Sequence, residues 1–590
     1  MVTAKELNKF LGRFQEEIRE AARVMESQKL PELTDDLFAL YEQTGNRLTY
    51  EKAYFGRRKF LAVFGLLSLL EKQQTDTVPV RVINKLETVM TEVCREECWA
   101  LPAHVNRADN PNWRMTVDLF AAETAQTLAE LTDRLDGILP EGLRILVCEN
   151  IEHRVFRPYF SSTVPYGIWE HAHHNWNAVC GGSIGSACLH VMRSQPGRLK
   201  ECLERISNAL PYYVSGFAED GTCMEGLSYF TYGMTYFVNF AEELFEYTGG
   251  RTDLLTGSWA GFFAGKEDKR YRMAVFQEKC YFEDGCSISF SDGYRNEKYR
   301  VGLSAVLAMR FPGVHLPRIE NAAGLQDDTC YRFAALKMDL LMTEKYCRQL
   351  EKQEPAPAGY GRREPVILPD AQWCIGNSAN GVGFACKGGS NGEPHNHNDI
   401  GHFIYESNGV FLLTDLGAGE YTRDYFGEKR YDILCNNSFG HSVPIINHTG
   451  QVPGCDSSCA NFQAGKDGHI SMELSGAYNG SGAGSLIRSF HFNMEQGELT
   501  TIDRLSGKED DFRENLVTQI KPVIQGNQVW LEDNGICGIL TVEEGLEGPI
   551  TVQTHNHINH SGSTEKVYTI SWKVASIEEI CVSRFGIKVT

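Results

Sequence analysis

Histidine and aspartate residues that could bind a metal ion gather in the second half of the sequence. Residues 394–399 read Pro-His-Asn-His-Asn-Asp, and Asp415 and His441 follow at longer spacing. Imidazole and carboxylate groups suit a borderline metal such as zinc, and three such ligands leave one coordination position for water. An isolated His-x-His is more often a polar loop beside a hairpin, but the downstream aspartate and histidine favour a metal site.

A hairpin argument brings a rival ligand to this site. The Asn-Gly pair at 408–409 is typical of a two-residue turn, and counting outward from that turn pairs Asp415 with His402. In this register His402 faces the aspartate, unless the loop before the strand folds His397 back over it.

A polar cluster in the first half could also serve catalysis. His174, Asn175 and Trp176 precede a segment rich in Gly and Ala, whose small residues let helices approach closely. Such a cluster at a helix start can point imidazole and amide groups into a cleft, although capping and packing explain it equally well.

Further along, Glu225, Tyr229 and Tyr232 follow a turn. Their spacing of four and three places all three on one face of a helix. Without context, a tyrosine pair on a helix is more often core than catalytic.

A second His-Asn-His triplet lies at 555–557, with His560 close behind. No Asp or His follows within a strand or two to complete a site. We interpret residues 554–560 as a solvated loop.

The apolar pattern divides the chain into two parts. Up to about residue 350 apolar residues recur at spacings of three and four, which predicts helices, whereas later segments alternate or form short apolar runs between turns. A tract rich in Pro separates them. We therefore predict an α+β multidomain chain, with a helical domain at 1–355, a linker at 356–369 and an antiparallel β domain at 370–590.

Charge and composition exclude several classes of protein. The net charge is -20, which argues against nonspecific nucleic-acid binding and requires a locally basic cleft for any anionic substrate, with Arg107 as one candidate. The most apolar short run, 61–70, is flanked by charges and is too short to span a membrane. Residues 2–25 lack the apolar centre of a secretory signal, and the 18 cysteines are dispersed in apolar segments. We expect reduced thiols and a cytoplasmic protein, or a periplasmic or secreted one if a leader has been removed.

These motifs together resemble the heparinase II/III-like family of polysaccharide lyases. The most specific part is the 394–399 run followed by Asp415-x-Gly417, Arg430-Tyr431 and Ser438-x-x-His441. Segments 99–104, 175–180 and 220–229 are similar to parts of that family around its active-site cleft. The resemblance covers about residues 95–450, in the same order.

The resemblance implies an incomplete α/α toroid followed by an antiparallel β-sandwich, with a uronic acid bound where they meet. It implies His397, Asp415 and His441 as ligands of one metal, Zn²⁺ first and Mn²⁺ as the alternative, in a structural role with His402 outside the ligand set. It implies His395 and Tyr229 as catalytic residues.

The same resemblance implies that Asn175 engages the uronate carboxylate. His174 could assist, and Tyr232 could replace Tyr229 if the helix is shifted by one turn. We expect substrate contacts from four further residues: Arg107, Trp176, Glu225 and Arg430.

The activity so implied is β-elimination, which removes the C5 proton of a uronate and expels the glycosidic oxygen. Expected substrates are heparin or heparan sulfate, chondroitin and hyaluronan, or their oligosaccharides, with alginate as the alternative in the same fold. A metal-dependent glycan hydrolase and a non-catalytic glycan-binding protein are the alternatives from other classes. We expect no nucleic-acid or membrane partner, and a homodimer is left open.

Overall fold

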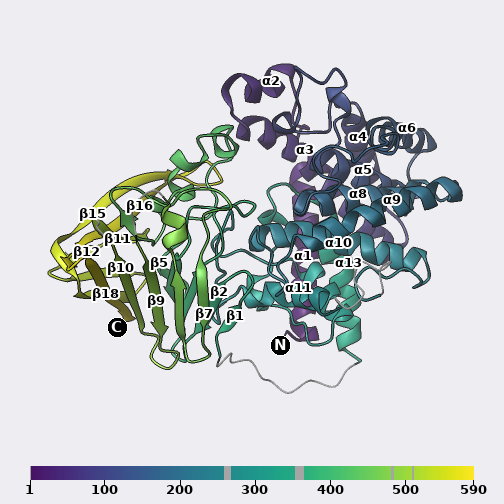
Figure 1. The fold of residues 1–590 in the computed structure, drawn as a ribbon. Coiled ribbons are helices and arrows are strands. Elements are labelled where there is room, and N and C mark those ends of the chain that lie inside the picture. The colour runs from purple at the N-terminus through teal and green to yellow at the C-terminus, as the bar shows by residue number, and fades with distance from the viewer. Residues whose placement is uncertain (1, 258–266, 353–363, 480–483, 508–510) are drawn as a thin grey trace. The chain divides into compact units, whose positions relative to one another are not determined.

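The computed structural model describes residues 2–257, 267–352, 364–479, 484–507 and 511–590. Within these residues the α-helices all precede residue 351 and the named strands all follow residue 365 (Figure 1). The predicted order, helices first and antiparallel strands second, is confirmed. Of the helices in the described ranges, none is both long enough and apolar enough to cross a bilayer. Most of the predicted linker, 356–363, lies outside the described residues.

The helices are α1 (Ala4–Met25), α2 (Asp35–Thr44), α3 (Leu48–Thr75), α4 (Val80–Cys94), α5 (Leu119–Arg134), α6 (Glu141–Ile151), α7 (Arg157–Phe160), α8 (Asn175–Val191), α9 (Pro196–Ser215), α10 (Leu227–Tyr247), α11 (Glu267–Lys279), α12 (Val301–Arg310) and α13 (Phe333–Leu350). The strands are β1 (Val366–Leu368), β2 (Trp373–Asn377), β3 (Val382–Lys387), β4 (Phe403–Ser407), β5 (Val410–Leu413), β6 (Ile445–Ile446), β7 (Ala460–Ala464), β8 (His469–Glu473), β9 (Leu486–Phe492), β10 (Leu499–Ser506), β11 (Phe512–Thr518), β12 (Val523–Gln525), β13 (Gln528–Asp533), β14 (Ile536–Glu544), β15 (Leu546–Ile558), β16 (Thr564–Val574), β17 (Ser576–Ile577) and β18 (Ile580–Val589).

The chain forms two compact units that are interleaved in sequence. The first unit comprises 1–217, 230–274 and 298–358, and the second comprises 218–229, 275–297 and 359–590. The predicted domains were single continuous stretches. They differ from these units because two short segments of the first half, 218–229 and 275–297, pack with the strands.

In the first unit, small residues set the spacing of the helices. Helix α8 is buried on nearly all sides, and a Cβ at Gly182 would lie 2.6 Å from the carbonyl oxygen of Tyr236 in α10. Only glycine permits this approach, and the close packing offsets the low helix propensity of the three glycines in α8. The close packing fixes the N-terminus of α8, where His174 and Asn175 lie.

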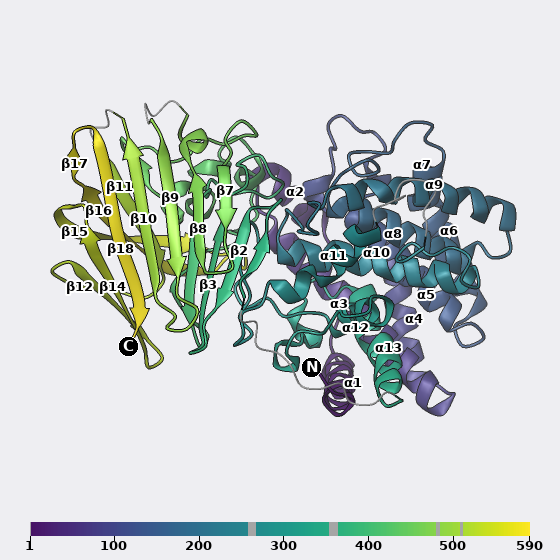
Figure 2. The same cartoon turned by 60° about the horizontal axis from the view of Figure 1, so that its bottom comes forward.

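In the second unit, the strands form three antiparallel sheets. Their orders are β1-β2-β3-β4-β5, β12-β13-β14-β18-β10-β9-β8-β7 with β17 beside β18, and β15-β16-β11-β6. Figure 2 shows β18, β10, β9 and β8 side by side. All three sheets contribute to one hydrophobic core, in which Phe384, Phe490, Leu516 and Trp572 are buried. Strand β10 alternates buried and more exposed residues, as a sheet packed on one face requires.

The predicted hairpin turn is present between β4 and β5. Asn408 and Gly409 both have positive φ, 47° and 87°, and Ser407 pairs with Val410. These angles match a turn whose twist suits the flanking strands. An irregularity next to Tyr405 shifts the register by one residue. The sequence register therefore holds near the turn and changes before it reaches the candidate metal ligands.

Candidate active site and metal centre

A histidine and a tyrosine form the centre of the candidate site, and both belong to the second unit. The ring of His395 stacks on the ring of Tyr229 with centroids 4.0 Å apart and planes inclined by 23°. Tyr229 is the third residue of α10. His395 lies in the loop between β3 and β4 and has a φ of 57°, which is uncommon for a residue with a side chain. The imidazole is held over the phenol ring by this stacking and by the contact of its Nδ1 with Asp292.

Asp292 is the buried hub of the site. Its Oδ2 lies 2.7 Å from Nδ1 of His395, and its Oδ1 lies 3.0 Å from Nε2 of His397. The Tyr421 hydroxyl donates to Oδ2 at 3.2 Å, and Tyr425 donates to Oδ1. Burial raises the pKa of Asp292, but the hydrogen bonds from the two histidines hold it well below its ordinary value. Asp292 is therefore a carboxylate that accepts hydrogen bonds from side chains of several segments.

The charge on Asp292 determines how His395 carries its proton. An ionised carboxylate only accepts hydrogen bonds, so Nδ1 of His395 must be the donor. In the neutral ring Nε2 then has a lone pair and can take a proton from a substrate. The carboxylate of Glu225 lies 3.7 Å from this Nε2. This arrangement can therefore present a proton acceptor at Nε2 of His395, with the Tyr229 phenol stacked beside the imidazole.

The loops that carry these residues approach each other closely. Gly417, which follows Asp415 in the Asp-x-Gly motif, has a φ of 63°, and a Cβ there would lie 2.2 Å from the carbonyl oxygen of Gly293. Ala418 donates its backbone N–H to the same oxygen at 3.3 Å. This approach brings Asp292 beside the 415–425 segment, which supplies Tyr421 and Tyr425.

A second cluster, next to the first, can hold a metal ion. His402, Asp415 and His441 have potential ligand atoms within 4.8 Å of one another, and so do His397, Asp399 and His441. Among the described residues, five atoms of this cluster are buried without a hydrogen-bond partner: Nδ1 of His397, Oδ2 of Asp399, Nε2 of His402, Oδ2 of Asp415 and Nδ1 of His441. Such buried polar atoms are rare unless something binds them, so this cluster fits a cation. Neither group contains His397, Asp415 and His441 together, so this predicted ligand set stays a prediction.

The protonation of each ring separates ligands from supporting residues. His397 donates Nε2–H to Asp292, and His441 donates Nε2–H to the Cys435 carbonyl oxygen at 2.8 Å, so Nδ1 is the nitrogen that each ring can offer to a metal. A carboxylate or carbonyl behind a histidine is the usual arrangement around a metal. Burial lowers the pKa of His441 to about 3, which keeps it neutral.

His402 has the opposite arrangement. The Ser442 backbone donates to its Nδ1 at 2.9 Å, so the hydrogen of a neutral ring sits on Nε2, which faces Asp415 Oδ2 at 3.3 Å. A nitrogen that carries a hydrogen cannot ligate a metal. His402 lies closer to Asp415 than His441 does, because Nδ1 of His441 is 3.8 Å from the same oxygen. The hairpin argument expected this order. The hydrogen on Nε2, however, lets His402 orient the carboxylate and not ligate a metal. Burial alone would raise the pKa of Asp415, but the contact with His402 holds that pKa below its usual value.

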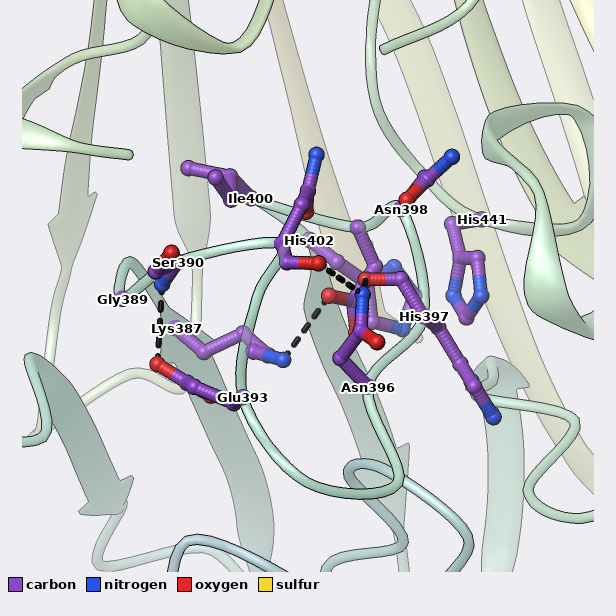
Figure 3. A network of polar contacts seen from close by, with 12 residues as sticks. Lys387, Gly389, Ser390, Glu393, Asn396, His397, Asn398, Ile400, His402 and His441 are labelled. Carbon is purple, nitrogen blue, oxygen red and sulfur yellow. Dashed lines mark hydrogen bonds and ion pairs between the residues drawn. The ribbon is translucent and has the colours of Figure 1, made fainter. Parts of the chain in front are cut away.

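Figure 3 shows how the loop after β3 carries this cluster. His397 and His441 lie beside each other, with ring centroids 5.2 Å apart, and Lys387 lies at the other side of the loop. Lys387 is almost fully buried and its Nζ is 2.8 Å from Asp399 Oδ1. This ion pair anchors the loop from which both His395 and His397 project.

The structure separates the two candidate tyrosines. The Tyr232 hydroxyl donates to Glu123, and the guanidinium of Arg332 lies 4.1 Å above the Tyr232 ring, all within the first unit. Burial and the Glu123 charge raise the pKa of Tyr232 well above its ordinary value. Of the two, only Tyr229 is brought together with His395.

Four further predicted residues belong to the first unit. Asn175 is buried at the first position of α8, and His174 is its N-cap residue. Trp176 packs against His104, with centroids 4.8 Å apart. Arg107 lies 5.0 Å from the Trp113 ring centroid. Their roles towards a substrate stay predictions.

Arg430 supports the site from within the protein. Its guanidinium donates to the backbone oxygens of Asn396 at 2.8 Å and Tyr425 at 3.1 Å, and it lies 3.6 Å from Asp292. These contacts bind the 394–399 loop to the 421–430 segment. Arg430 therefore has a structural role, in addition to the substrate contact that we expected from the sequence.

Sequence reasoning missed Asp292, Tyr421 and Tyr425 and misread the second His-Asn-His triplet. That triplet is not a solvated loop, because it lies in β15, where alternation places His557 in the interior at 2% exposure. His560 packs edge-on against Tyr421 with centroids 4.4 Å apart. In the sequence, Asp292 is marked only by its position before Gly293 in a short segment, and this pattern is a weak indication of a functional residue.

This chain is similar to known proteins in its fold. No protein-family profile and no curated protein matches the sequence. A heparinase III gene product matches 98% of this chain and 84% of its own, with a TM-score of 0.60 and 14% identity. A second heparinase III structure matches 100% of this chain and 92% of its own (TM-score 0.59, 12% identity). A heparan sulfate lyase from Pedobacter heparinus matches 99% and 88% (TM-score 0.57, 12% identity).

These matches span nearly the whole chain, so the resemblance to the heparinase II/III-like fold is confirmed. A helical N-terminal region followed by antiparallel sheets is the toroid and β-sandwich that the resemblance implied. At this level of identity the comparison concerns the fold. Function has to be argued from the site.

Proposed function

We propose that this chain is a polysaccharide lyase that cleaves uronic-acid-containing glycans by β-elimination. The observation that carries the proposal is the stacked pair of His395 and Tyr229, with Asp292 holding Nδ1 of the histidine. The pair offers a nitrogen base and a phenol acid side by side, which is the equipment that an elimination needs.

The reaction begins at C5 of the uronate. The base removes the C5 proton, the electron pair forms the double bond between C4 and C5, and the C4–O bond breaks as an acid protonates the leaving oxygen. His395 and Tyr229 divide these two roles according to the configuration at C5, because the proton lies on opposite faces in glucuronic and iduronic acid.

The carboxylate at C5 has to be neutralised for the carbanion to form. Asn175, with His174, supplies donors that strengthen their hydrogen bonds as negative charge moves onto the carboxylate, which is selective stabilisation of the transition state. Glu225 contributes a carboxylate near His395 and suits a sugar hydroxyl better than an anionic group.

We also propose one divalent metal, Zn²⁺ before Mn²⁺, held by His397, Asp415 and His441. The donor set of two neutral imidazoles and one carboxylate supports zinc. Bound there, the ion would fix the loop that carries His395 and neutralise the charge of Asp415. His402 orients Asp415 from behind.

The proposed substrates are heparan sulfate or heparin first, because the structural matches include proteins named for those glycans. Chondroitin, hyaluronan and oligosaccharides derived from these polymers follow, with alginate as the alternative. The chain's net charge of -20 makes salt dependence of the affinity an informative companion measurement.

A panel of defined polymers and oligosaccharides tests the proposal. A lyase raises the near-ultraviolet absorbance of the unsaturated uronate in step with new reducing ends. New reducing ends without that absorbance would show a hydrolase instead. Binding without either product would show a glycan-binding protein. His395→Ala, assayed beside the surface variant His153→Gln, links the activity to the site.

A further inference from the structure

The Tyr229 hydroxyl has a partner that the reaction described above does not use. It lies 2.6 Å from the hydroxyl of Tyr421, which in turn donates to Asp292 Oδ2 at 3.2 Å. The three groups come from α10, the segment after β5 and the 275–297 segment. They form a continuous chain of hydrogen bonds within the second unit.

The position of the single hydroxyl proton of Tyr421 sets the direction of the hydrogen bonds in this network. While that proton points to the Asp292 carboxylate, the Tyr421 oxygen can accept a hydrogen bond from the Tyr229 hydroxyl. Once Tyr229 has lost its proton, the Tyr421 hydroxyl can turn and donate to the phenolate oxygen. Hydrogen bonds to an ionised acceptor are roughly twice as strong as neutral ones, so this contact strengthens as Tyr229 reacts.

The ring of Tyr421 is held firmly enough for this task. It packs against Tyr425 and Phe426, each at 4.8 Å between centroids, and His560 meets it edge-on at 4.4 Å. The hydroxyl can therefore rotate its hydrogen while its oxygen stays in place. Preorganised donors of this kind avoid the cost of reorganisation during the reaction.

We propose that Tyr421 is a positioning residue that stabilises the Tyr229 phenolate when Tyr229 acts as the acid of the elimination, an inference that rests on the proposed lyase function. The base takes the C5 proton, the C4–O bond breaks, and the Tyr229 proton goes to the leaving oxygen. The Tyr421 hydroxyl then donates to the phenolate. The one proton gained by the base and the one lost by Tyr229 balance, and exchange with water restores both groups.

Tyr425 provides a matched control variant. It lies four residues after Tyr421, is fully buried and also donates to Asp292, but through Oδ1. Its hydrogen bond ends on the carboxylate and not on Tyr229. Tyr421→Phe and Tyr425→Phe each remove one hydroxyl from the same surroundings, so they separate support of Tyr229 from support of Asp292.

The test compares two substrates that differ in their need for an acid. One is the best polymer found in the panel, and the other is a uronate that carries an acidic phenol as the leaving group at C4. For Tyr421→Phe we expect kcat on the polymer to fall about 10- to 100-fold, with KM little changed, as expected for a lost hydrogen bond to a charged group. With the phenol leaving group the loss should nearly vanish, whereas any loss in Tyr425→Phe should be equal on both substrates.

The inference would be overturned by equal losses of Tyr421→Phe on both substrates, by the same response in Tyr425→Phe, or by additive losses in the Tyr229→Phe/Tyr421→Phe double variant. If Tyr421→Phe does not fold, as judged by thermal unfolding, a ring-fluorinated tyrosine at 421 keeps the shape and must retain the polymer rate. A wild-type chain that forms unsaturated product while Tyr421→Phe keeps full kcat sinks this inference alone. No unsaturated product from the wild type sinks both proposals.

Discussion

The imidazole of His395 and the phenol of Tyr229 lie in contact, 4.0 Å between ring centroids, although the two residues are 166 positions apart in the sequence. The two ring planes are inclined by 23°, so the imidazole and the phenol are stacked side chains of one site. A substrate carbon and its leaving oxygen are also neighbours, so one bound sugar can meet both groups at once.

The first prediction distinguishes the two tyrosines of α10. Tyr229→Phe removes one hydroxyl and should keep the fold, yet lower kcat by about 10² to 10⁴, the range typical of general acid-base groups. Tyr232→Phe should retain most activity, because its hydroxyl is bound to Glu123 in the first unit. The measurement is the rate of unsaturated product formation on the same polymer. The reverse order of activities would move the assignment one helical turn.

The second prediction concerns Asp292. Asp292→Asn replaces one accepting oxygen with an NH₂ group, which meets donors from His395 or His397. The histidine tautomer is then no longer fixed, and we expect kcat to fall by about 10² to 10⁴. Metal affinity should also fall about 10- to 100-fold, because Asp292 supports His397. Assays at saturating zinc separate the two effects, and near wild-type kcat under those conditions would contradict the assigned role.

The sequence predicts much of this site because its residues lie close together in the chain. His395 and His397 stand in one short motif, and the Asn-Gly turn after them fixes a hairpin by backbone preferences alone. Asp415 follows at the end of that hairpin. Local chemistry and spacing were sufficient here, and the helical and β halves followed from the change in apolar period.

Asp292 could not be predicted in this way. It comes from a short segment that lies about a hundred residues before His395 and packs with the strands, whereas most of the preceding helix α11 and all of the following helix α12 belong to the other unit. No periodic pattern marks such an interleaved segment. The buried position of His557 was missed for a similar reason, because alternation within β15 becomes visible only once its pairing with β16 is known.

The third prediction concerns stability against pH and a buried cluster in the first unit. His190 lies 2.7 Å from Asp133 and 3.7 Å from Glu243, and Lys337 also binds Glu243. Burial lowers the pKa of His190, but hydrogen bonds and charges from Asp133 and Glu243 raise it to about 9 overall. A pKa raised above its unfolded value contributes stability that is fully present below about pH 6.5 and is lost as the pH rises through about 9.

This contribution amounts to at most about 3 kcal/mol, since one pKa unit corresponds to about 1.4 kcal/mol. In His190→Gln we therefore expect the fall in Tm between about pH 6.5 and 9 to become shallower. Thermal unfolding across that range measures it, with the exposed His153→Gln as control. Parallel curves for wild type and His190→Gln would show that the cluster does not titrate as described.

The last prediction decides which histidines hold the metal. His397→Ala and His441→Ala should each lose the ion, because their Nδ1 lone pairs face the site without a partner among the described residues. His402→Gln should retain it with an affinity lowered by about 10- to 100-fold, since the amide can still donate to Asp415 in place of Nε2–H. Elemental analysis after dialysis against a weak chelator gives the metal content, and Tm with and without added zinc gives an independent reading, because binding to the folded state raises stability. Loss of metal in His402→Gln together with retention in His397→Ala would mean that the hairpin register, and not the tautomers, identifies the ligands. Loss in none of the three variants would place the ion elsewhere and leave the buried atoms of His397 and His441 to another ligand.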